Sequence, residues 1–356
     1  MARRKKNVGN GDGAVKASWQ TVSLRELATH VGLSPTTLSL VLNDAPAAHS
    51  IPQETKDRIF EAVEKFNYRP NYFARSLRAQ RSFTLGVLMP ELSDPYSAMV
   101  LSGVEEVLLQ EGYFYFSASH RHRANLIAEY PNLLLDRRVE GIIAFDTHFK
   151  KRIQLPLVTV SSHEEIEGVT NIILNHQRAA ELALDHLQAL GHQKIAFLKG
   201  QEFTSDTEIR WQSIYEAAKE RNLEIHLSLT AQLEGDKPSS ESGFLATCRI
   251  LEQNQAFSAL FAFNDVSAIG AIRALQESGR RVPEDVSVLG FDDIYAAAFH
   301  NPALTTIRQP LFQMGKLAAQ TLLKRIAEPE SNSNLPQTIF VEPELVVRQS
   351  TAQMAE

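Results

Sequence analysis

The chain has 356 residues and a net charge of −6, which is unevenly distributed: residues 1–82 are net +6 and the remainder is net −12. A basic segment joined to an acidic body indicates that the two parts meet different partners. The single cysteine, Cys248, excludes an internal disulfide framework, and no apolar run is long enough to cross a bilayer, so we expect a cytoplasmic protein.

Residues 1–20 are basic, rich in glycine and without apolar periodicity, so we expect a disordered tail. The basic run from Arg3 to Lys6 is followed by a glycine-rich stretch at 9–13 and not by an apolar segment. This order excludes a secretory signal.

Residues 21–70 are predicted to form three short helices. Ser23 can cap the first helix, which Gly32 ends, and Ser34 can cap the second with Pro35 at its first position, where the missing N–H costs nothing. The apolar positions at helical spacing are Leu24, Leu27, Ala28 and Val31 in the first helix, Leu38, Val41 and Leu42 in the second, and Ile59, Phe60, Val63 and Phe66 in the third. This order is typical of a helix-turn-helix unit, although any small helical bundle can show it.

A different pattern begins near residue 83, where short apolar runs alternate with amphipathic segments. The runs cover 85–89, 141–145, 157–160, 194–198, 259–263 and 286–291, and helical segments include 179–190, 210–221 and 266–278. Buried strands that alternate with helices form parallel sheets covered on both faces. Their number over ~260 residues indicates two such sheets, because single cores stop growing near that size.

Several short motifs follow one another in the chain: Gly32-Leu33-Ser34-Pro35-Thr36-Thr37, Asn67-Tyr68-Arg69-Pro70, Leu190-Gly191-His192, Asn264-Asp265, Gly290-Phe291-Asp292-Asp293 and the stretch from Asn301 to Pro310. In this order and spacing they resemble the lactose-repressor (LacI/GalR) family of bacterial transcription regulators, from about Val22 to Ser350. The resemblance implies an α/β fold. An all-α helix-turn-helix headpiece would precede a two-lobed body like that of periplasmic sugar-binding proteins, with two parallel-sheet subdomains.

The resemblance also implies domain boundaries. After the tail at 1–20, the headpiece is expected at 21–70, a hinge helix and linker at 71–82, an effector-binding and dimerisation domain at 83–350, and a C-terminal tail at 351–356. One lobe of the body is expected to comprise about 83–176 and 304–327, and the other about 177–303 and 328–350. The chain would then cross between the lobes near residues 177, 303 and 327.

The second headpiece helix is the expected recognition helix. By resemblance, Pro35, Thr36 and Leu40 read bases in the major groove, whereas Thr37, Ser39 and Asn43 contact phosphates. The alternative is that the hydroxyl side chains are merely solvated. Leu40 departs from the family, which usually has a polar or basic residue there, and a leucine can meet a thymine methyl but cannot hydrogen-bond a base. Three extra residues also lie within Asp44–Pro52.

The segment 71–78 resembles a hinge helix that forms on operator DNA. Leu77 matches the leucine that wedges into the minor groove and kinks a base step, and Arg75 and Arg78 would lie near phosphates. A plain linker helix is the alternative.

An effector site is expected between the lobes, at the carboxyl ends of the strands. The resemblance and the strand positions assign to it Asp94, Tyr96, Asn175, Arg210, Asn264, Asp265 and Asp292. Arginine, asparagine and aspartate together can hydrogen-bond adjacent hydroxyls, which suits a sugar. For Asp265 an N-cap role remains open, and for Asp292 a loop turn. Asn175 stands where the family usually has aspartate, and Ser213-Ile214 also depart from it.

No catalytic set, metal-binding spacing or cofactor motif emerges. We therefore expect a homodimeric repressor that binds a near-palindromic operator and responds to a small-molecule effector, a sugar or sugar phosphate. A sugar-binding transport receptor and an enzyme on the same scaffold are the alternatives.

Overall fold

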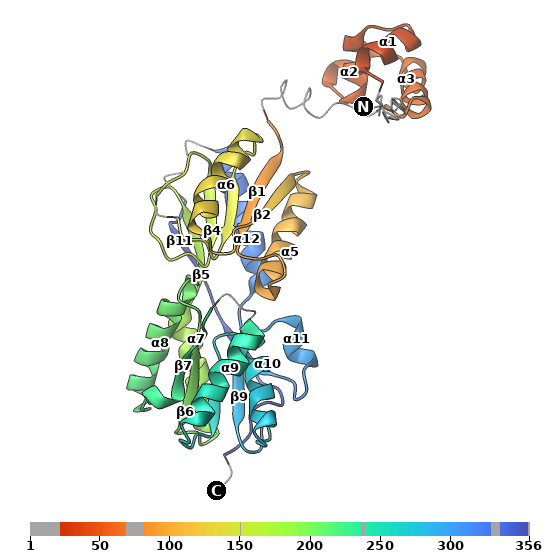
Figure 1. Ribbon diagram of the computed structural model, residues 1–356. Helices are drawn as coiled ribbons and strands as arrows, with labels where there is room; N and C mark the ends of the chain where they lie inside the picture. The colour runs from red at the N-terminus through yellow and green to blue at the C-terminus, as the bar shows by residue number, and fades with distance from the viewer. Residues whose placement is uncertain (1–21, 69–80, 150, 236–238, 329–334, 355–356) are drawn as a thin grey trace, which may run out of the picture. The chain divides into compact units, whose positions relative to one another are not determined.

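The computed structural model describes residues 22–68, 81–149, 151–235, 239–328 and 335–354. They fall into two units, a headpiece that ends at Arg81 and a body that begins at Ser82 (Figure 1). The expected N-terminal tail and all but the last two residues of the expected hinge segment lie outside the described residues. No helix among the described residues is long and apolar enough to span a bilayer.

Residues 22–68, the described part of the headpiece apart from Arg81, contain four short helical segments: α1 (Leu24–Val31), α2 (Pro35–Leu42), the 3-10 helix η1 (Pro46–Ser50) and α3 (Gln53–Lys65). Ser23 forms a capping box with Glu26 at the start of α1, and Gly32 ends this helix with φ +72°, a conformation that glycine adopts without a steric penalty. The Ser34 hydroxyl accepts the N–H of Thr37 at the start of α2. The predicted helix boundaries follow from these local interactions.

The centre of the headpiece core is made of Leu27, Leu38 and Ile59, which are fully buried. The prediction of the headpiece core was wrong at one position. Phe60 is 48% exposed, and Ala62 packs in the core instead. Phe60 follows Ile59 directly, so it lies on a different side of α3, whereas positions three and four residues apart share a face. The extra residues near position 48 form η1, which adds Ala48 to the core.

The described residues of the body form two six-stranded sheets, which confirms the predicted α/β class. The first has the order β11-β5-β4-β3-β1-β2 and the second the order β12-β10-β9-β8-β6-β7. The first comprises β1 (Thr84–Met89), β2 (Phe114–Ser119), β3 (Ile142–Phe145), β4 (Leu157–Val160), β5 (Thr170–Leu174) and β11 (Thr338–Val341). The second comprises β6 (Ile195–Lys199), β7 (Thr230–Gln232), β8 (Ala259–Phe261), β9 (Ser287–Asp292), β10 (Thr305–Arg308) and β12 (Glu344–Val346). All neighbours are parallel except β10 and β12.

Helices cover both sheets (Figure 1). The first lobe has α5 (Pro95–Gln110), α6 (Ala124–Asp136) and α12 (Leu311–Ala327), and the second has α7 (His176–Ala189), α8 (Asp206–Glu220), η2 (Leu227–Leu229), α9 (Ser239–Glu252), α10 (Asp265–Glu277) and α11 (Tyr295–Phe299). Helices α5 and α12 are in close contact because each has a glycine at the crossing. A Cβ on Gly103 would lie 1.9 Å from the Phe312 carbonyl oxygen, and one on Gly315 would lie 2.0 Å from that of Val100.

The chain crosses between the lobes three times, but two of the expected crossing points were wrong. Strand β10 pairs with β9 of the second lobe, so the second crossing follows residue 308 and not 303. Strand β11 pairs with β5 of the first lobe, so the third crossing follows residue 341 and not 327. Short apolar strands look alike in sequence, and only long-range pairing decides the sheet to which each belongs.

Part of the expected C-terminal tail is hydrogen-bonded to the second lobe. The hydroxyl of Thr351 lies 2.9 Å from Nε2 of His186, and the backbone N–H of Met354 donates to the Leu190 carbonyl. Residues 351–354 therefore lie along the second lobe.

Candidate functional site

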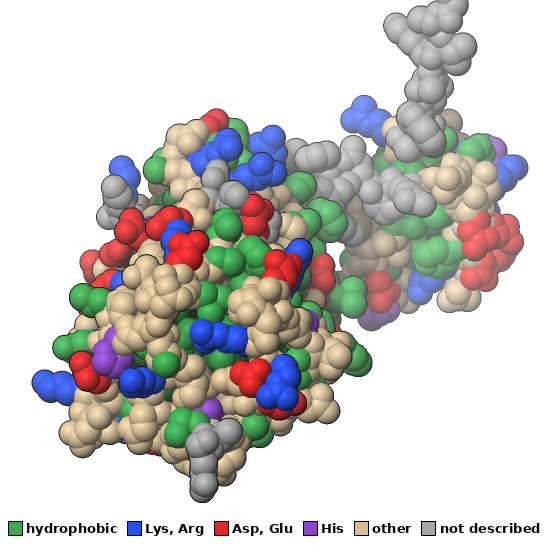
Figure 2. Space-filling model, turned by 60° about the horizontal axis from the view of Figure 1, so that its bottom comes forward, with side chains coloured by type: hydrophobic (Ala, Val, Ile, Leu, Met, Phe, Trp, Pro, Cys, Tyr) green, Lys and Arg blue, Asp and Glu red, His purple; other side chains and the backbone are tan. Residues whose placement is uncertain are grey.

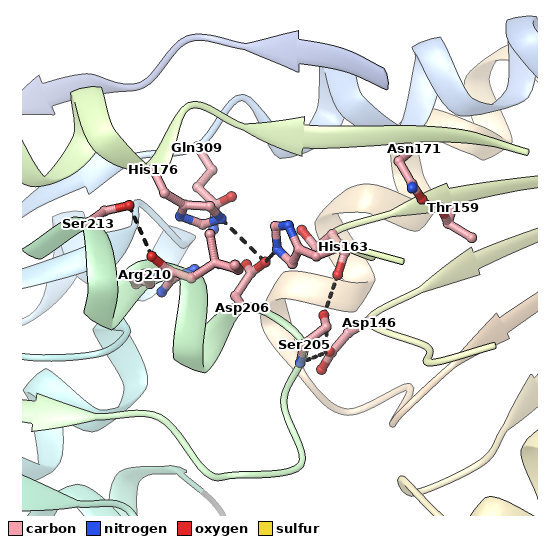
Figure 3. A network of polar contacts seen from close by, with 12 residues as sticks. Asp146, Thr159, His163, Asn171, His176, Ser205, Asp206, Arg210, Ser213 and Gln309 are labelled. Carbon is pink, nitrogen blue, oxygen red and sulfur yellow. Dashed lines mark hydrogen bonds and ion pairs between the residues drawn. The ribbon is translucent and has the colours of Figure 1, made fainter. Parts of the chain in front are cut away.

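Polar side chains from both lobes meet at the carboxyl ends of the strands. Asp146, which follows β3 in the first lobe, accepts a hydrogen bond of 2.6 Å from the backbone N–H of Ser205 in the second lobe. The Ser205 hydroxyl also contacts the Asp146 carboxylate (Figure 3) and the Ser161 carbonyl. Tyr96, expected in the site, donates its hydroxyl proton to Ser161 at 2.7 Å. The lobes are thus joined by direct contacts.

Arg210 is the central cation of this region and is only 4% exposed. Its guanidinium carbon lies 3.8 Å from the ring centroid of Phe291 and 4.4 Å from that of Phe263. One terminal nitrogen donates to the Phe263 carbonyl at 2.6 Å and the other to Asp206 at 3.0 Å. These contacts fix the guanidinium plane between the aromatic rings.

Asp206 is the anion that pairs with Arg210, and it is buried. Burial alone would raise the pKa of Asp206, but contacts with His176, His163 and Arg210 outweigh burial and hold this pKa well below its usual range. Burial lowers the pKa of His176. Asp206 is therefore ionised, and Arg210 is its cationic partner.

Asp292, at the end of β9, is a second buried carboxyl group. The Gln309 side-chain amide donates to it at 2.6 Å. Burial raises the pKa of Asp292 well above its ordinary value, against the opposing effect of Arg210. The backbone of Asp292 has φ +107°, which is strained for a residue with a side chain. Strain of this kind persists at functional sites because the surroundings enforce it.

Unsatisfied polar atoms concentrate at this place. Six buried side-chain nitrogen or oxygen atoms of the described residues form no hydrogen bond, and four of them belong to this region: both ring nitrogens of His176, Nε of Arg210 and Oε1 of Gln309. Leaving such an atom without a partner costs about 1–3 kcal/mol. Their concentration indicates a site that is completed by a ligand.

The structure distributes the expected effector residues between two roles. Tyr96, Arg210 and Asp292 lie in the inter-lobe region, where Tyr96 and Asp292 interact electrostatically. Asp94 caps α5 by accepting the Ser97 N–H, and its electrostatic interaction with Asp292 places it at the edge of the same region.

Asn175, Asn264 and Asp265 make structural contacts. Asn175 caps α7 and donates to the Glu342 carboxylate. Asn264, and not Asp265, is the N-cap of α10. Asp265 is fully buried and accepts hydrogen bonds from the Thr306 hydroxyl and the Ile294 N–H.

Sequence reasoning missed several members of the site: Asp146, His163, His176, Ser205, Asp206 and Gln309. His176 directly follows Asn175, an expected effector residue, and Gln309 lies in the family motif from Asn301 to Pro310. Both residues could therefore have been considered as site residues from the sequence. Helix α8 begins at Asp206, one turn before the predicted start at Arg210, and this placed Asp206 outside the expected helix.

Charges of both signs are mixed on one face of the body. The face of the body seen in Figure 2 carries acidic and basic side chains interspersed with apolar ones. The candidate site is located by the buried inter-lobe contacts described above.

The residues of the expected recognition helix, α2, and its C-cap Asn43 differ in their exposure to solvent. Pro35, Thr36 and Asn43 are exposed, whereas Leu40 is half-buried against the headpiece core. The Asn43 amide donates to the Ser39 carbonyl at 2.6 Å. Thr37 and Ser39 are half-buried, and the Thr37 hydroxyl lies 2.9 Å from that of Ser34. The expected hinge contacts of Arg75, Leu77 and Arg78 lie outside the described residues.

Comparisons with known proteins agree with both units. Residues 23–71 match the model for bacterial regulatory proteins of the lacI family, and residues 184–351 match a periplasmic binding protein-like domain. The chain is 32% identical over 338 residues to the HTH-type transcriptional repressor PurR of Haemophilus influenzae, an alignment that covers 92% of this chain and 98% of the relative. The headpiece match favours a regulator over the helical-bundle and transport-receptor alternatives.

Solved structures show the same similarity. The Lac repressor dimer bound to operator and the anti-inducer ONPF has a TM-score of 0.81 and 26% identity, over 94% of this chain and 100% of that one. The complex of the transcriptional regulator CelR with cellobiose has a TM-score of 0.68 and 25% identity, over 92% and 99%. The chain belongs to the lacI family of bacterial regulatory proteins and is a DNA-binding transcriptional regulator with an effector-binding body.

Proposed function

We propose that the chain is a homodimeric repressor whose affinity for a near-palindromic operator is controlled by an uncharged sugar bound between the lobes. The observation that carries the effector site is the concentration of unsatisfied buried atoms on His176, Arg210 and Gln309. The dimer and the operator are supported by the similarity to the Lac repressor dimer on its operator. A two-fold protein fits a two-fold DNA site.

A sugar suits the donors and acceptors of the region. Nε of Arg210 is an unused donor and Oε1 of Gln309 an unused acceptor, and sugar hydroxyls can serve both. Phe263 and Phe291 hold the Arg210 guanidinium between their rings, so the polar group is fixed before a ligand binds, as is typical of small-molecule sites. The cellobiose complex of the related CelR supports the same class of ligand.

The charges of the region favour a neutral sugar over a sugar phosphate. Four carboxyl groups interact electrostatically here, those of Asp94, Asp146, Asp206 and Asp292. The guanidinium of Arg210 is already paired with Asp206. A phosphate would add negative charge beside the ionised carboxylates of Asp146 and Asp206, and beside Asp94 and Asp292, whose raised pKa values already reflect a setting that disfavours negative charge.

The same region provides a route to regulation. A ligand changes operator affinity only if it binds two states of the body with different affinity. Arg210 bonds Asp206, which directly follows Ser205 in the chain, so we infer that a sugar that engages Arg210 alters the Ser205–Asp146 contact between the lobes. We infer that the chain acts by binding and not by catalysis, in the cytoplasm together with its DNA.

Calorimetric titration of the full-length protein with neutral sugars, sugar phosphates and nucleobases tests the effector class. We expect a neutral sugar to bind and its phosphorylated form to bind more weakly. Tighter binding of the phosphorylated form would overturn the charge argument. Binding of a nucleobase in place of every sugar would overturn the sugar assignment while retaining a small-molecule site.

A further inference from the structure

Two imidazoles and a carboxylate meet where the lobes join. The ligand atoms of His163, His176 and Asp206 all lie within 4.8 Å of one another. His163 follows β4 in the first lobe, His176 is the first residue of α7 after the first crossing, and Asp206 is the first residue of α8 in the second lobe. Figure 3 shows both imidazoles turned toward the Asp206 carboxylate. The cluster therefore draws on both lobes and one crossing.

The spacing suits a tetrahedral metal ion. Oδ1 of Asp206 lies 2.8 Å from Nε2 of His163 and 3.4 Å from Nε2 of His176. A zinc ion with nitrogen and oxygen ligands at ~2.0–2.2 Å holds neighbouring ligand atoms about 3.3 Å apart. The observed distances lie on both sides of this value, so small side-chain movements would admit an ion.

The imidazole of His176 is incompletely bonded. Its side chain is 3% exposed, Nε2 lies 3.4 Å from Oδ1 of Asp206 without the geometry of a hydrogen bond, and Nδ1 has no hydrogen-bond partner among the described residues. Nε2 points into the cluster, where an ion would satisfy it.

Arg210 already provides an outer contact of the kind that orients metal ligands. It holds Oδ2 of Asp206 at 3.0 Å and leaves Oδ1 facing the two imidazoles. Outer contacts of this kind fix the orientation of a ligating carboxylate. Two imidazoles with one carboxylate select zinc-class ions over magnesium or calcium, which prefer oxygen ligands.

We propose that His163, His176 and Asp206 bind a divalent transition-metal ion of the zinc class, which links the two lobes. This departs from the sequence-based expectation of no metal. Three protein ligands leave a fourth position for water or for a hydroxyl of the effector. Binding of the ion does not depend on the proposed function, but any effect of the ion on operator affinity rests on it.

The test uses tag-free full-length protein that has been treated with a chelator and then dialysed. Zn²⁺ binding is measured by calorimetry, and Co²⁺ replaces Zn²⁺ for absorption spectra of the bound ion. The variants are His163→Gln and His176→Gln, with His226→Gln as the matched control, because His226 lies in the second lobe beside Glu224 and outside the cluster. Thermal unfolding in chelator shows whether each variant folds.

We expect one Zn²⁺ per chain in the wild type and in the control, and at least about tenfold weaker binding in both cluster variants. Co²⁺ bound to the wild type should give the visible bands of a tetrahedral site, and Zn²⁺ should abolish them. Absence of binding to the wild type would overturn the proposal, as would equal affinity in the cluster variants and the control. If a cluster variant does not fold, the wild-type Co²⁺ spectrum decides: an octahedral spectrum would overturn the proposal.

Sugar titration of the metal-free protein separates this proposal from the preceding one. Sugar binding without any metal site would overturn only the metal proposal. Zn²⁺ binding at the cluster without any sugar effect would support the metal site and contradict the sugar assignment.

Discussion

The backbone N–H of Ser205 in the second lobe donates a 2.6 Å hydrogen bond to the Asp146 carboxylate in the first lobe. Burial raises the pKa of Asp146 to about 6, so at neutral pH this carboxylate is ionised and accepts a charge-assisted hydrogen bond. The contact holds two segments together that are 59 residues apart in sequence.

Replacement Asp146→Ala should loosen the contact between the lobes, because the Ser205 N–H loses its acceptor. We expect faster hydrogen exchange at the Ser205 amide, by about tenfold or more if the bond contributes ~1.5–3 kcal/mol. Asp136→Ala, at an exposed position at the end of α6, is the matched control. Unchanged hydrogen exchange at the Ser205 amide in Asp146→Ala would show that the contact between the lobes persists without this hydrogen bond.

Asp265 should make the body less stable as pH rises from about 4 to 7. Burial raises the pKa of Asp265 to about 7, whereas its ordinary value is 3.8. A carboxyl group whose pKa is higher in the folded state favours folding below pH 4 and loses this contribution as the pH approaches 7. The side chain in Asp265→Asn can still hydrogen-bond Ile294 and Thr306, but it does not titrate. The substitution should therefore remove this pH dependence of the free energy of unfolding.

Urea unfolding of both proteins between pH 4.5 and 8 measures the effect. The variant should gain stability relative to the wild type as pH rises, toward a limit of about 4 kcal/mol. A constant difference between the two proteins across this range would contradict the assignment of the raised pKa to Asp265.

Gly103→Ala should destabilise the body, because the new Cβ would lie 1.9 Å from the Phe312 carbonyl oxygen on α12. Backbone must move to relieve this overlap, at a cost of about 1–3 kcal/mol. Ser102→Ala, at the neighbouring exposed position of α5, is the control. Urea midpoints that shift equally for the two variants would exclude the close helix contact.

Leu40 should read a thymine methyl, although it is half-buried against the headpiece core. Uracil in place of the contacted thymine should weaken operator binding by about 0.8 kcal/mol, the value of one buried methyl-sized group, and Leu40→Ala should erase the difference. Binding selection from random DNA first supplies the operator. If no thymine in the half-site shows this dependence, Leu40 serves the headpiece core alone.

The headpiece could be predicted from sequence in most details because its signals are local. Ser23, Ser34 and Pro35 act within one helical turn, and Gly32 ends α1 by its own backbone conformation. The α/β class of the body followed equally from short apolar runs, since buried parallel strands have a recognisable composition. Lobe membership did not follow, because β10 and β11 are assigned by pairing with strands distant in sequence.

The inter-lobe site was only partly predictable. Arg210 and Asp292 stand out because they occur beside an expected helix and after an expected strand. His163 lies in a loop with no periodic pattern and joins the site only because β4 ends beside the second lobe. Contacts between loops depend on the folded arrangement of both lobes, for which a single sequence contains no local signal.

The central claim is that the inter-lobe site couples an effector to operator affinity, and fluorescence anisotropy with labelled operator tests it most directly. Wild type, Asp292→Ala and the control Asp285→Ala, which alters a surface pair with Arg281, are titrated with DNA over a series of sugar concentrations. We predict that sugar shifts operator affinity in the wild type and control, that Asp292→Ala needs about 10–100-fold more sugar for the same shift, and that operator affinity without sugar is equal in all three. An operator affinity that no sugar changes, or an Asp292→Ala response at wild-type sugar concentrations, would contradict the account.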